Sequence, residues 1–176
     1  MNLYLIGHDY RYAAEQMLLT LFPDERPEYP DGRPTGDRAE LRLMSGPKIT
    51  TVTCVLVYQD RTANGRTSVP NSELTDPNET DRRLQGAVKR AAMGIGLPHR
   101  PWGMLTGVRP GKLMTPLLAQ GMGDTQAMRY FERHYDVAPA RAALVVRTAH
   151  ATLRAMDSLG DKDVCLYVGI PFCPTR

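Results

Sequence analysis

The side chains that could hold a metal or perform covalent chemistry are few and widely spaced in this sequence. They are the three cysteines and the four histidines, namely Cys54, Cys165, Cys173, His8, His99, His134 and His150. Their spacing matches no zinc-ligand pattern, and an odd number of separated cysteines is not a secreted disulfide framework. Cys54 lies within a β-branched run, where a cysteine is most simply a small core residue. We therefore expect no self-contained metal site, and a reducing cytoplasm is the simplest location.

The segment from Arg100 to Lys112 concentrates residues that bind ligands or pack against neighbouring surfaces. It holds the single tryptophan of the chain, several glycines that allow close backbone approach, and cationic side chains. Its candidate substrate or interface residues are Trp102, Thr106, Arg109 and Lys112. One interpretation is a structural linker, in which Trp102 fills the core and Arg109 holds a helix end. The other is a contact with a ligand or a domain, because arginine binds carboxylate and phosphate groups.

The pair Gly111-Lys112 within this segment does not form a phosphate-binding loop. That motif requires a glycine five residues before Gly111 and a serine or threonine after the lysine. Thr106 and Leu113 occupy those positions. A nucleotide-binding interpretation is therefore excluded on two counts.

The residues that precede this segment predict a mixed α+β domain over residues 1–97, with the element order β-α-β-β(-β)-α. Apolar residues recur at helical spacing in the helices, and β-branched or apolar residues fill the strands. We expect strands at 3–6, 40–45, 49–58 and 66–69, and helices at 10–22 and after Asp76. Gly46-Pro47 and Asn64-Gly65 are expected to form tight turns between strands.

Helix-start residues support the later elements. We expect Asp76 to accept hydrogen bonds from free backbone N–H groups, Pro77 to occupy the first helical position, and Glu79 to reach back as in a capping box. A small helical segment then follows over residues 98–160. Its helices are predicted at 110–120, at 125–135 behind Asp124 as a cap, and at 139–156.

Composition and charge exclude several classes of protein. The 176 residues are 42% hydrophobic, as is ordinary for a globular protein with a real core. The net charge of +3 is too small and too dispersed to indicate a nucleic-acid or membrane partner. No apolar run approaches the ~18 residues of a membrane span, and the first residues do not resemble a signal peptide. We therefore expect a cytoplasmic protein without a membrane span.

The C-terminal residues carry the most specific pattern. The apolar run 164–170 is typical of a strand buried on both faces of a parallel sheet. Together with residues 171–176 it resembles the opening strand and loop of radical S-adenosylmethionine enzymes of the oxygen-independent coproporphyrinogen oxidase group. Cys173 matches the first cysteine of their Cys-x3-Cys-x2-Cys motif, and Pro174-Thr175-Arg176 match the three spacer residues. The segment 102–110 further resembles one branch of that group, the HemZ-type coproporphyrinogen dehydrogenases.

This resemblance implies the chemistry of a longer parent protein. Such enzymes hold a [4Fe–4S] cluster through three thiolates, and the cluster supplies the electron that cleaves S-adenosylmethionine. By resemblance, Tyr167 contacts S-adenosylmethionine and Cys173 ligates one iron. The implied activity is oxidative decarboxylation of coproporphyrinogen III to protoporphyrinogen IX in haem biosynthesis. The implied partners are the radical S-adenosylmethionine barrel, the porphyrinogen substrate and an electron donor.

We expect this chain alone to be an inactive N-terminal fragment of such an enzyme. A (β/α)8 barrel takes ~250 residues, so residues 161–176 provide only the start of a truncated barrel. One thiolate cannot hold a cluster that needs three, and we expect this chain to bind neither cluster nor S-adenosylmethionine. The alternative is a free-standing interaction or RNA-binding module that uses the Arg100–Lys112 cluster as its contact surface. The predicted strands lack an aromatic stacking pair, which counts against RNA.

Overall fold

The computed structural model of the chain describes residues 1–76, 78–106, 109–160, 162–164, 166 and 168–169. Four strands precede most of the helices along the chain. The elements are β1 (Asn2–Ile6), α1 (Arg11–Leu21), β2 (Arg38–Ser45), β3 (Ile49–Tyr58), β4 (Arg61–Pro70), a short 3-10 helix (Asn71–Glu73), α2 (Glu79–Gly94), α3 (Pro110–Ala119), α4 (Asp124–Tyr135) and α5 (Pro139–Asp157). The mixed α+β class predicted from the sequence is confirmed.

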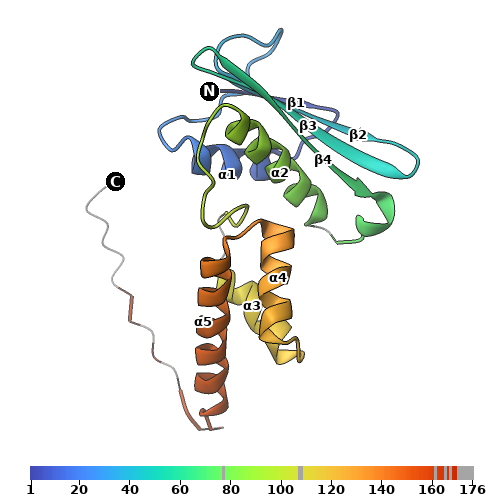
Figure 1. The fold of residues 1–176 in the computed structure, drawn as a ribbon. Helices are drawn as coiled ribbons and strands as arrows, with labels where there is room; N and C mark the ends of the chain where they lie inside the picture. The colour runs from blue at the N-terminus through green and yellow to red at the C-terminus, as the bar shows by residue number, and fades with distance from the viewer. Residues whose placement is uncertain (77, 107–108, 161, 165, 167, 170–176) are drawn as a thin grey trace.

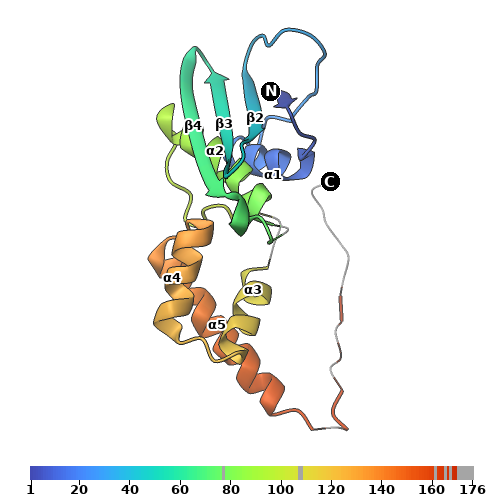
Figure 2. The same cartoon turned by 90° about the vertical axis from the view of Figure 1, so that its right-hand side faces the viewer.

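The strands form a single open sheet in the order β1-β2-β3-β4. β1 runs parallel to β2, and the other neighbours are antiparallel. Leu41 of β2 is paired with Leu5 on one side and with Cys54 on the other. Both α1 and α2 cover the same face of this sheet (Figures 1 and 2). The result is a two-layer unit whose other sheet face is covered by no helix of the described residues.

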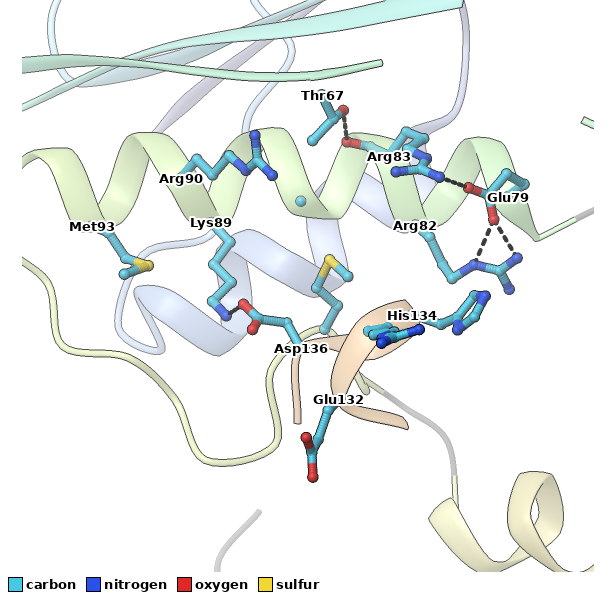
Figure 3. Close-up of a pocket in the computed structure, with 13 residues that line it drawn as sticks. Thr67, Glu79, Arg82, Arg83, Lys89, Arg90, Met93, Glu132, His134 and Asp136 are labelled. Carbon is cyan, nitrogen blue, oxygen red and sulfur yellow. Dashed lines mark hydrogen bonds and ion pairs between the residues drawn. The ribbon is translucent and has the colours of Figure 1, made fainter. Parts of the chain in front are cut away.

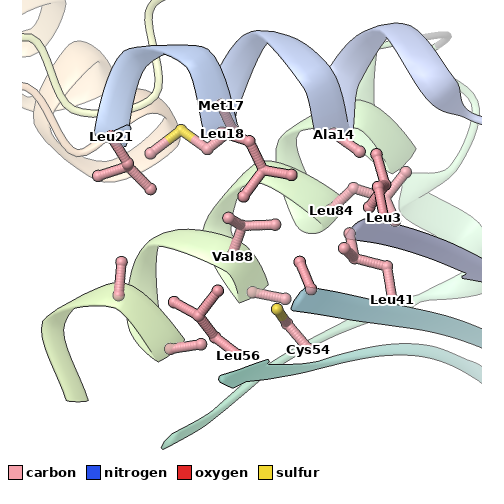
Figure 4. Packing of buried hydrophobic residues seen from close by; sticks show 14 of the residues in the cluster. Leu3, Ala14, Met17, Leu18, Leu21, Leu41, Cys54, Leu56, Leu84 and Val88 are labelled. Carbon is pink, nitrogen blue, oxygen red and sulfur yellow. The ribbon is translucent and has the colours of Figure 1, made fainter. Parts of the chain in front are cut away.

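The larger hydrophobic core fills the space between the sheet and the first two helices (Figure 4). Alternate side chains of a strand point to the same face, so Val52, Cys54 and Leu56 of β3 all face the helices and are at most 1% exposed. Leu84 and Val88 are four residues apart on α2 and therefore project from one helix face into the same core. Burial of each such leucine or valine contributes ~1.5–3 kcal/mol, which holds α2 against the sheet.

Cys54 lies in the middle of this core and should be chemically inert in the folded chain. Its exposed fraction is 0%, and burial, with a smaller effect of Glu40, raises the pKa of the thiol to about 12. Because the thiolate is the nucleophile, we expect no reaction of Cys54 with Ellman's reagent at pH 8 until the chain is unfolded in urea. A Cys165→Ser/Cys173→Ser variant isolates this thiol for the measurement. Fast labelling of that folded variant would contradict the burial of Cys54.

The last three helices pack around a second hydrophobic core. Met114 of α3, Phe131 of α4 and Ala142 of α5 are all fully buried there. Pro110 and Pro139 stand at the first turns of α3 and α5, where the missing N–H of proline costs no helical hydrogen bond. The three helices predicted between residues 98 and 160 are thus confirmed.

The prediction of a tight turn at Asn64-Gly65 is wrong. Both residues lie inside β4, and the chain instead reverses at Gln59 and Asp60, whose φ angles are 49° and 63°. Gly65 serves a different purpose, since α2 crosses directly over it. A Cβ atom at Gly65 would lie 1.8 Å from the carbonyl oxygen of Ala87.

The start of α2 differs from the predicted cap. Asn78, not Asp76, takes the capping position, and no side chain bonds to the free N–H groups there. The carboxylate of Asp76 does accept a hydrogen bond from the backbone N–H of Asn78 at 2.9 Å. Glu79 does not complete a capping box, because its carboxylate is instead paired with arginines of the same helix. Pro77 lies outside the described residues.

The prediction that Asp124 caps α4 from outside the helix is wrong. Asp124 is the first residue of α4, Gly123 takes the capping position, and no side chain bonds to the free N–H groups there. The Asp124 carboxylate instead meets Nε2 of His150 on α5 at 2.7 Å. This contact ties two helices together rather than ending one.

The predicted buried strand at 164–170 is not formed by the part of this segment that the structure describes. Val164, Leu166 and Val168 are 90%, 89% and 76% exposed and belong to no strand. A strand buried on both faces needs neighbouring strands, and the observed sheet order offers none beside these residues. No barrel is seen in the described ranges. The domain boundaries near residues 97 and 160 stay predictions.

The described helices include none that combines the length and the apolar character needed to cross a membrane.

Candidate functional site

Two of the residues singled out from the sequence, Trp102 and Thr106, are held by contacts within the chain. Trp102 is half-buried against the second core, and the guanidinium carbon of Arg141 lies 5.4 Å from the centre of its ring. Thr106 is 7% exposed and its hydroxyl accepts a hydrogen bond from the Gln85 amide at 3.1 Å. These contacts join the segment 100–106 to both helical layers. They are the contacts of a structural linker, and a role toward a ligand stays a prediction.

The two candidate cations, Arg109 and Lys112, lie elsewhere on the surface. Arg109 immediately precedes α3, its carbonyl accepts from the backbone N–H of Lys112 at 2.9 Å, and both side chains are exposed. The structure therefore does not bring these cations to the buried positions of Trp102 and Thr106. Their use as an RNA or protein contact stays a prediction. Tyr167 and Cys173, the residues implied by the resemblance, lie outside the described residues.

The structure instead forms a hollow where α2 and β4 meet the end of α4. Its volume is about 470 Å³, within the usual range for small-molecule sites. We call it the junction hollow; it is lined by Thr67, Glu79, Arg82, Arg83, Gly86, Lys89, Arg90, Met93, Met104, Glu132, Arg133, His134 and Asp136. Figure 3 shows Lys89 of α2 pointing toward Asp136, just after α4, while Arg90 stays on the side of the strand. Cationic side chains outnumber carboxylates in this lining.

One end of the junction hollow is a buried ion-pair network. Glu79 is 5% exposed and pairs with both Arg82 and Arg83, with Nε of Arg82 at 2.9 Å from its carboxylate. Arg82 is itself only 8% exposed and also meets Asp76 at 2.5 Å. Hydrogen bonding from Arg82 is the main cause that lowers the pKa of Asp76. These arginines are neutralised within the chain, so they contribute structure more than free positive charge.

The other end of the hollow joins the two halves of the chain through Lys89. Its ammonium group pairs with Asp136 just after α4 and lies 2.9 Å from Nε2 of His99. Lys89 is 3% exposed, and burial, with the nearby charge of Arg90, lowers its pKa to about 8. The ion pair with Asp136 offsets part of the cost of burying this ammonium group.

Three arginines around this region have no carboxylate partner among the described residues. They are Arg66 on β4, Arg90 on α2 and Arg133 on α4. Nη1 of Arg90 donates to the carbonyl oxygen of Arg66 at 2.7 Å, which fixes one guanidinium beside the strand. Fixed guanidinium groups are suited to carboxylate and phosphate oxygens.

The sequence interpretation overlooked these residues, although a usable pattern was present. Arg82 and Lys89 are seven residues apart on α2, and so are Arg83 and Arg90. A spacing of seven is two helical turns, so each pair projects from nearly the same side of the helix. The residues of β4 and α4 that line the junction hollow show no comparable spacing in the sequence.

The unpaired guanidinium groups among the described residues are suited to binding anions. No group of three His, Cys, Asp or Glu side chains that could hold a metal ion occurs among the described residues. Glu132 is the carboxylate of the hollow that has no ion pair in the described part, and it points away from α2 (Figure 3). The hollow therefore presents unpaired positive charge to solvent.

Fold and site thus define a mixed α+β protein with a cationic hollow between its sheet-bearing and helical parts. In sequence, the chain is similar to the oxygen-independent coproporphyrinogen-III oxidase-like protein HemZ of Bacillus subtilis (strain 168), with 36% identity over 77 residues. The matched segment covers 43% of this chain and 15% of that relative. No protein-family model matches the chain. No solved structure matches it either.

Proposed function

We propose that this chain forms the N-terminal region of a radical S-adenosylmethionine oxidoreductase that converts coproporphyrinogen III to protoporphyrinogen IX in haem biosynthesis. The observation that carries the proposal is the 36% identity over 77 residues with the coproporphyrinogen-III oxidase-like protein of Bacillus subtilis. The residues around Cys173 give independent support, because they match the start of a cluster-binding cysteine motif.

The described residues do not themselves fit a [4Fe–4S] cluster. Such a cluster takes its ligands from several thiolates, and Cys54, the cysteine that the structure describes, is 0% exposed beneath the sheet. No step of the reaction is therefore assigned to the described residues. Under this proposal, Cys173 and cysteines beyond residue 176 provide the ligands in the longer protein.

The proposal is tested first on the coding sequence and then on the full-length protein. We expect cysteine codons at the fourth and seventh positions after that of Cys173, in a frame long enough to encode a barrel. The full-length protein, reconstituted with iron and sulfide under anaerobic conditions and supplied with S-adenosylmethionine, a one-electron reductant and an electron acceptor, should release 5′-deoxyadenosine and oxidise coproporphyrinogen III. Both products are measured by chromatography.

A full-length Cys173→Ala variant is the matched control and should lose both the cluster absorbance and the products. A stop codon directly after residue 176 would refute the proposal. Cleavage of S-adenosylmethionine without porphyrin product would retain the cofactor class and remove the proposed substrate.

A further inference from the structure

The exposed side of α4 carries a further hollow that is lined by cationic and aromatic side chains. Its volume is about 440 Å³. We call it the α4 hollow; it is lined by Met122, Thr125, Gln126, Arg129, Tyr130, Arg133 and His134. Ala127 and Phe131, the residues of α4 that are fully buried in the second core, are not part of this lining. The hollow therefore lies on the side of the helix that the core leaves open.

The positive charge of the α4 hollow is not neutralised within the described part of the chain. Arg129 and Arg133 are four residues apart, so their side chains lie one above the other on the same side of the helix. Both are exposed, and neither forms an ion pair with a described carboxylate. The carboxylates of α4 itself, Asp124 and Glu132, lie outside the lining. Each guanidinium can therefore bind an anionic group of its own.

Two aromatic rings beside these arginines form a stacked pair. The ring centroids of Tyr130 and His134 are 4.1 Å apart, and the ring planes are inclined by 26°. The carbonyl oxygen of Tyr130 accepts a hydrogen bond from Nδ1 of His134 at 3.0 Å, which holds the imidazole in this orientation. Tyr130 is half-buried against the second core, whereas His134 is exposed. The imidazole is thus an oriented ring on which a further flat ring can stack.

The shape of the α4 hollow favours a chain molecule over a small ligand. Every residue of the lining lies in α4 or within two residues of its start, so no other element of the described chain forms an opposite wall. Sites for small molecules usually enclose most of the ligand surface. A chain molecule needs less enclosure, because several of its groups bind along the same helix. Single-stranded nucleic acid offers phosphates and flat bases in regular succession, and it binds to cationic grooves with aromatic stacking platforms.

We propose that the α4 hollow binds a single strand of nucleic acid. Two phosphates of the strand bind to Arg129 and Arg133, and one base stacks on His134. Arg133 and His134 also line the junction hollow, so the strand extends to the mouth of that hollow. The proposal does not depend on the radical chemistry proposed above, because every residue in it lies in the described part of the chain.

Binding is measured by fluorescence anisotropy with the 176-residue chain and a labelled single strand of about twelve adenylates, a length typical of such sites. The titration is repeated at several salt concentrations at pH 8. Each phosphate contact of a single strand contributes about 0.7 to the slope of log affinity against log salt concentration. Poly-glutamate is added as a competitor, because it has the negative charge of an acidic peptide but no aromatic bases. We expect the strand to bind at low salt and poly-glutamate, at equal concentration of charge, to displace it poorly.

Variants separate the phosphate contacts from the stacking contact. We expect Arg129→Ala and Arg133→Ala each to weaken binding about ten-fold, as loss of a charge-assisted hydrogen bond does, and to reduce the salt slope by about 0.7. His134→Ala should also weaken binding about ten-fold but leave the salt slope unchanged, because it removes a stacked ring. His134→Phe retains an aromatic ring and should bind nearly as tightly as the parent chain.

Arg147→Ala is the matched control for the arginine variants. It removes the same charge from an exposed position on α5 that does not line the α4 hollow. Neither the affinity nor the salt slope should change. Circular dichroism verifies that each variant is folded before its affinity is compared.

Four results would overturn the proposal. The first is no binding of the strand at low salt. The second is an equal loss of affinity in Arg147→Ala and in the α4 variants, which would indicate only non-specific attraction to a cationic chain. The third is an unchanged affinity of His134→Ala, which would mean that no base stacks on this ring. The fourth is displacement of the strand by poly-glutamate at equal charge, which would make α4 a surface for acidic peptides.

Discussion

A Gly65→Ala variant is expected to lose about 3 kcal/mol of folding stability, the upper end of the range for overpacking. The added methyl group would lie 1.8 Å from the carbonyl oxygen of Ala87 and 2.7 Å from the backbone nitrogen of Ala91. Both obstacles are backbone atoms of α2, so no side-chain rotation relieves the clash. The helix must move away from β4, which opens the core around Val88. Urea unfolding followed by circular dichroism measures the loss.

Gly111→Ala is the matched control for this prediction. Gly111 lies in the first turn of α3, and a Cβ there would have no atom within 4 Å. Because alanine favours helix more than glycine does, the variant should be as stable as the parent chain or slightly more stable. Equal effects of the two substitutions would show that α2 does not press against β4 at Gly65.

The contrast between these glycines shows which structural features a local sequence pattern can predict and which it cannot. The helices and the first hairpin were predictable because the spacing of apolar residues, such as Leu84 and Val88, is set by the period of each element. Asn64-Gly65 was misinterpreted because the same dipeptide serves either a tight turn or a close approach of another element. Only the packing of α2 across the sheet distinguishes these uses. The turn is formed by Gln59 and Asp60. Neither residue is a glycine, so this dipeptide indicates a turn less strongly than Asn-Gly does.

The candidate site was less predictable than the fold for a related reason. Arg83 and Arg90 could be placed on one side of a helix from their spacing alone. Whether each arginine is neutralised depends on carboxylates that reach it in three dimensions, as Glu79 does for Arg83. The pairing of Lys89 with Asp136 joins residues from separate parts of the chain and has no counterpart in local spacing. The weak net charge of the whole chain thus concealed a local excess of unpaired cations.

Glu79→Ala is expected to cost about 3 kcal/mol, the loss typical of a buried ion pair that is deprived of one partner. The substitution would leave Arg82, which is 8% exposed, with Asp76 as its remaining partner. Arg83 would retain only a contact with Glu73 at 4.0 Å. Unfolding in urea at pH 7 measures the effect. Glu132→Ala is the matched control, because Glu132 also lines the junction hollow but has no ion pair among the described residues; it should change stability by less than about 0.5 kcal/mol.

An Asp76→Asn variant should lose its stability deficit in acid. The hydrogen bond from Arg82 lowers the pKa of Asp76 below its ordinary value of 3.8. A carboxylate with a lowered pKa stabilises the folded state above its ordinary pKa, and this contribution is lost as the pH falls through the folded-state pKa. Asparagine does not ionise, so the variant lacks this contribution at every pH. We therefore expect the variant to be less stable than the parent chain at pH 7 and the difference between them to narrow as the pH is lowered below 3.8, and a constant difference would mean that the Asp76 carboxylate does not stabilise the folded chain.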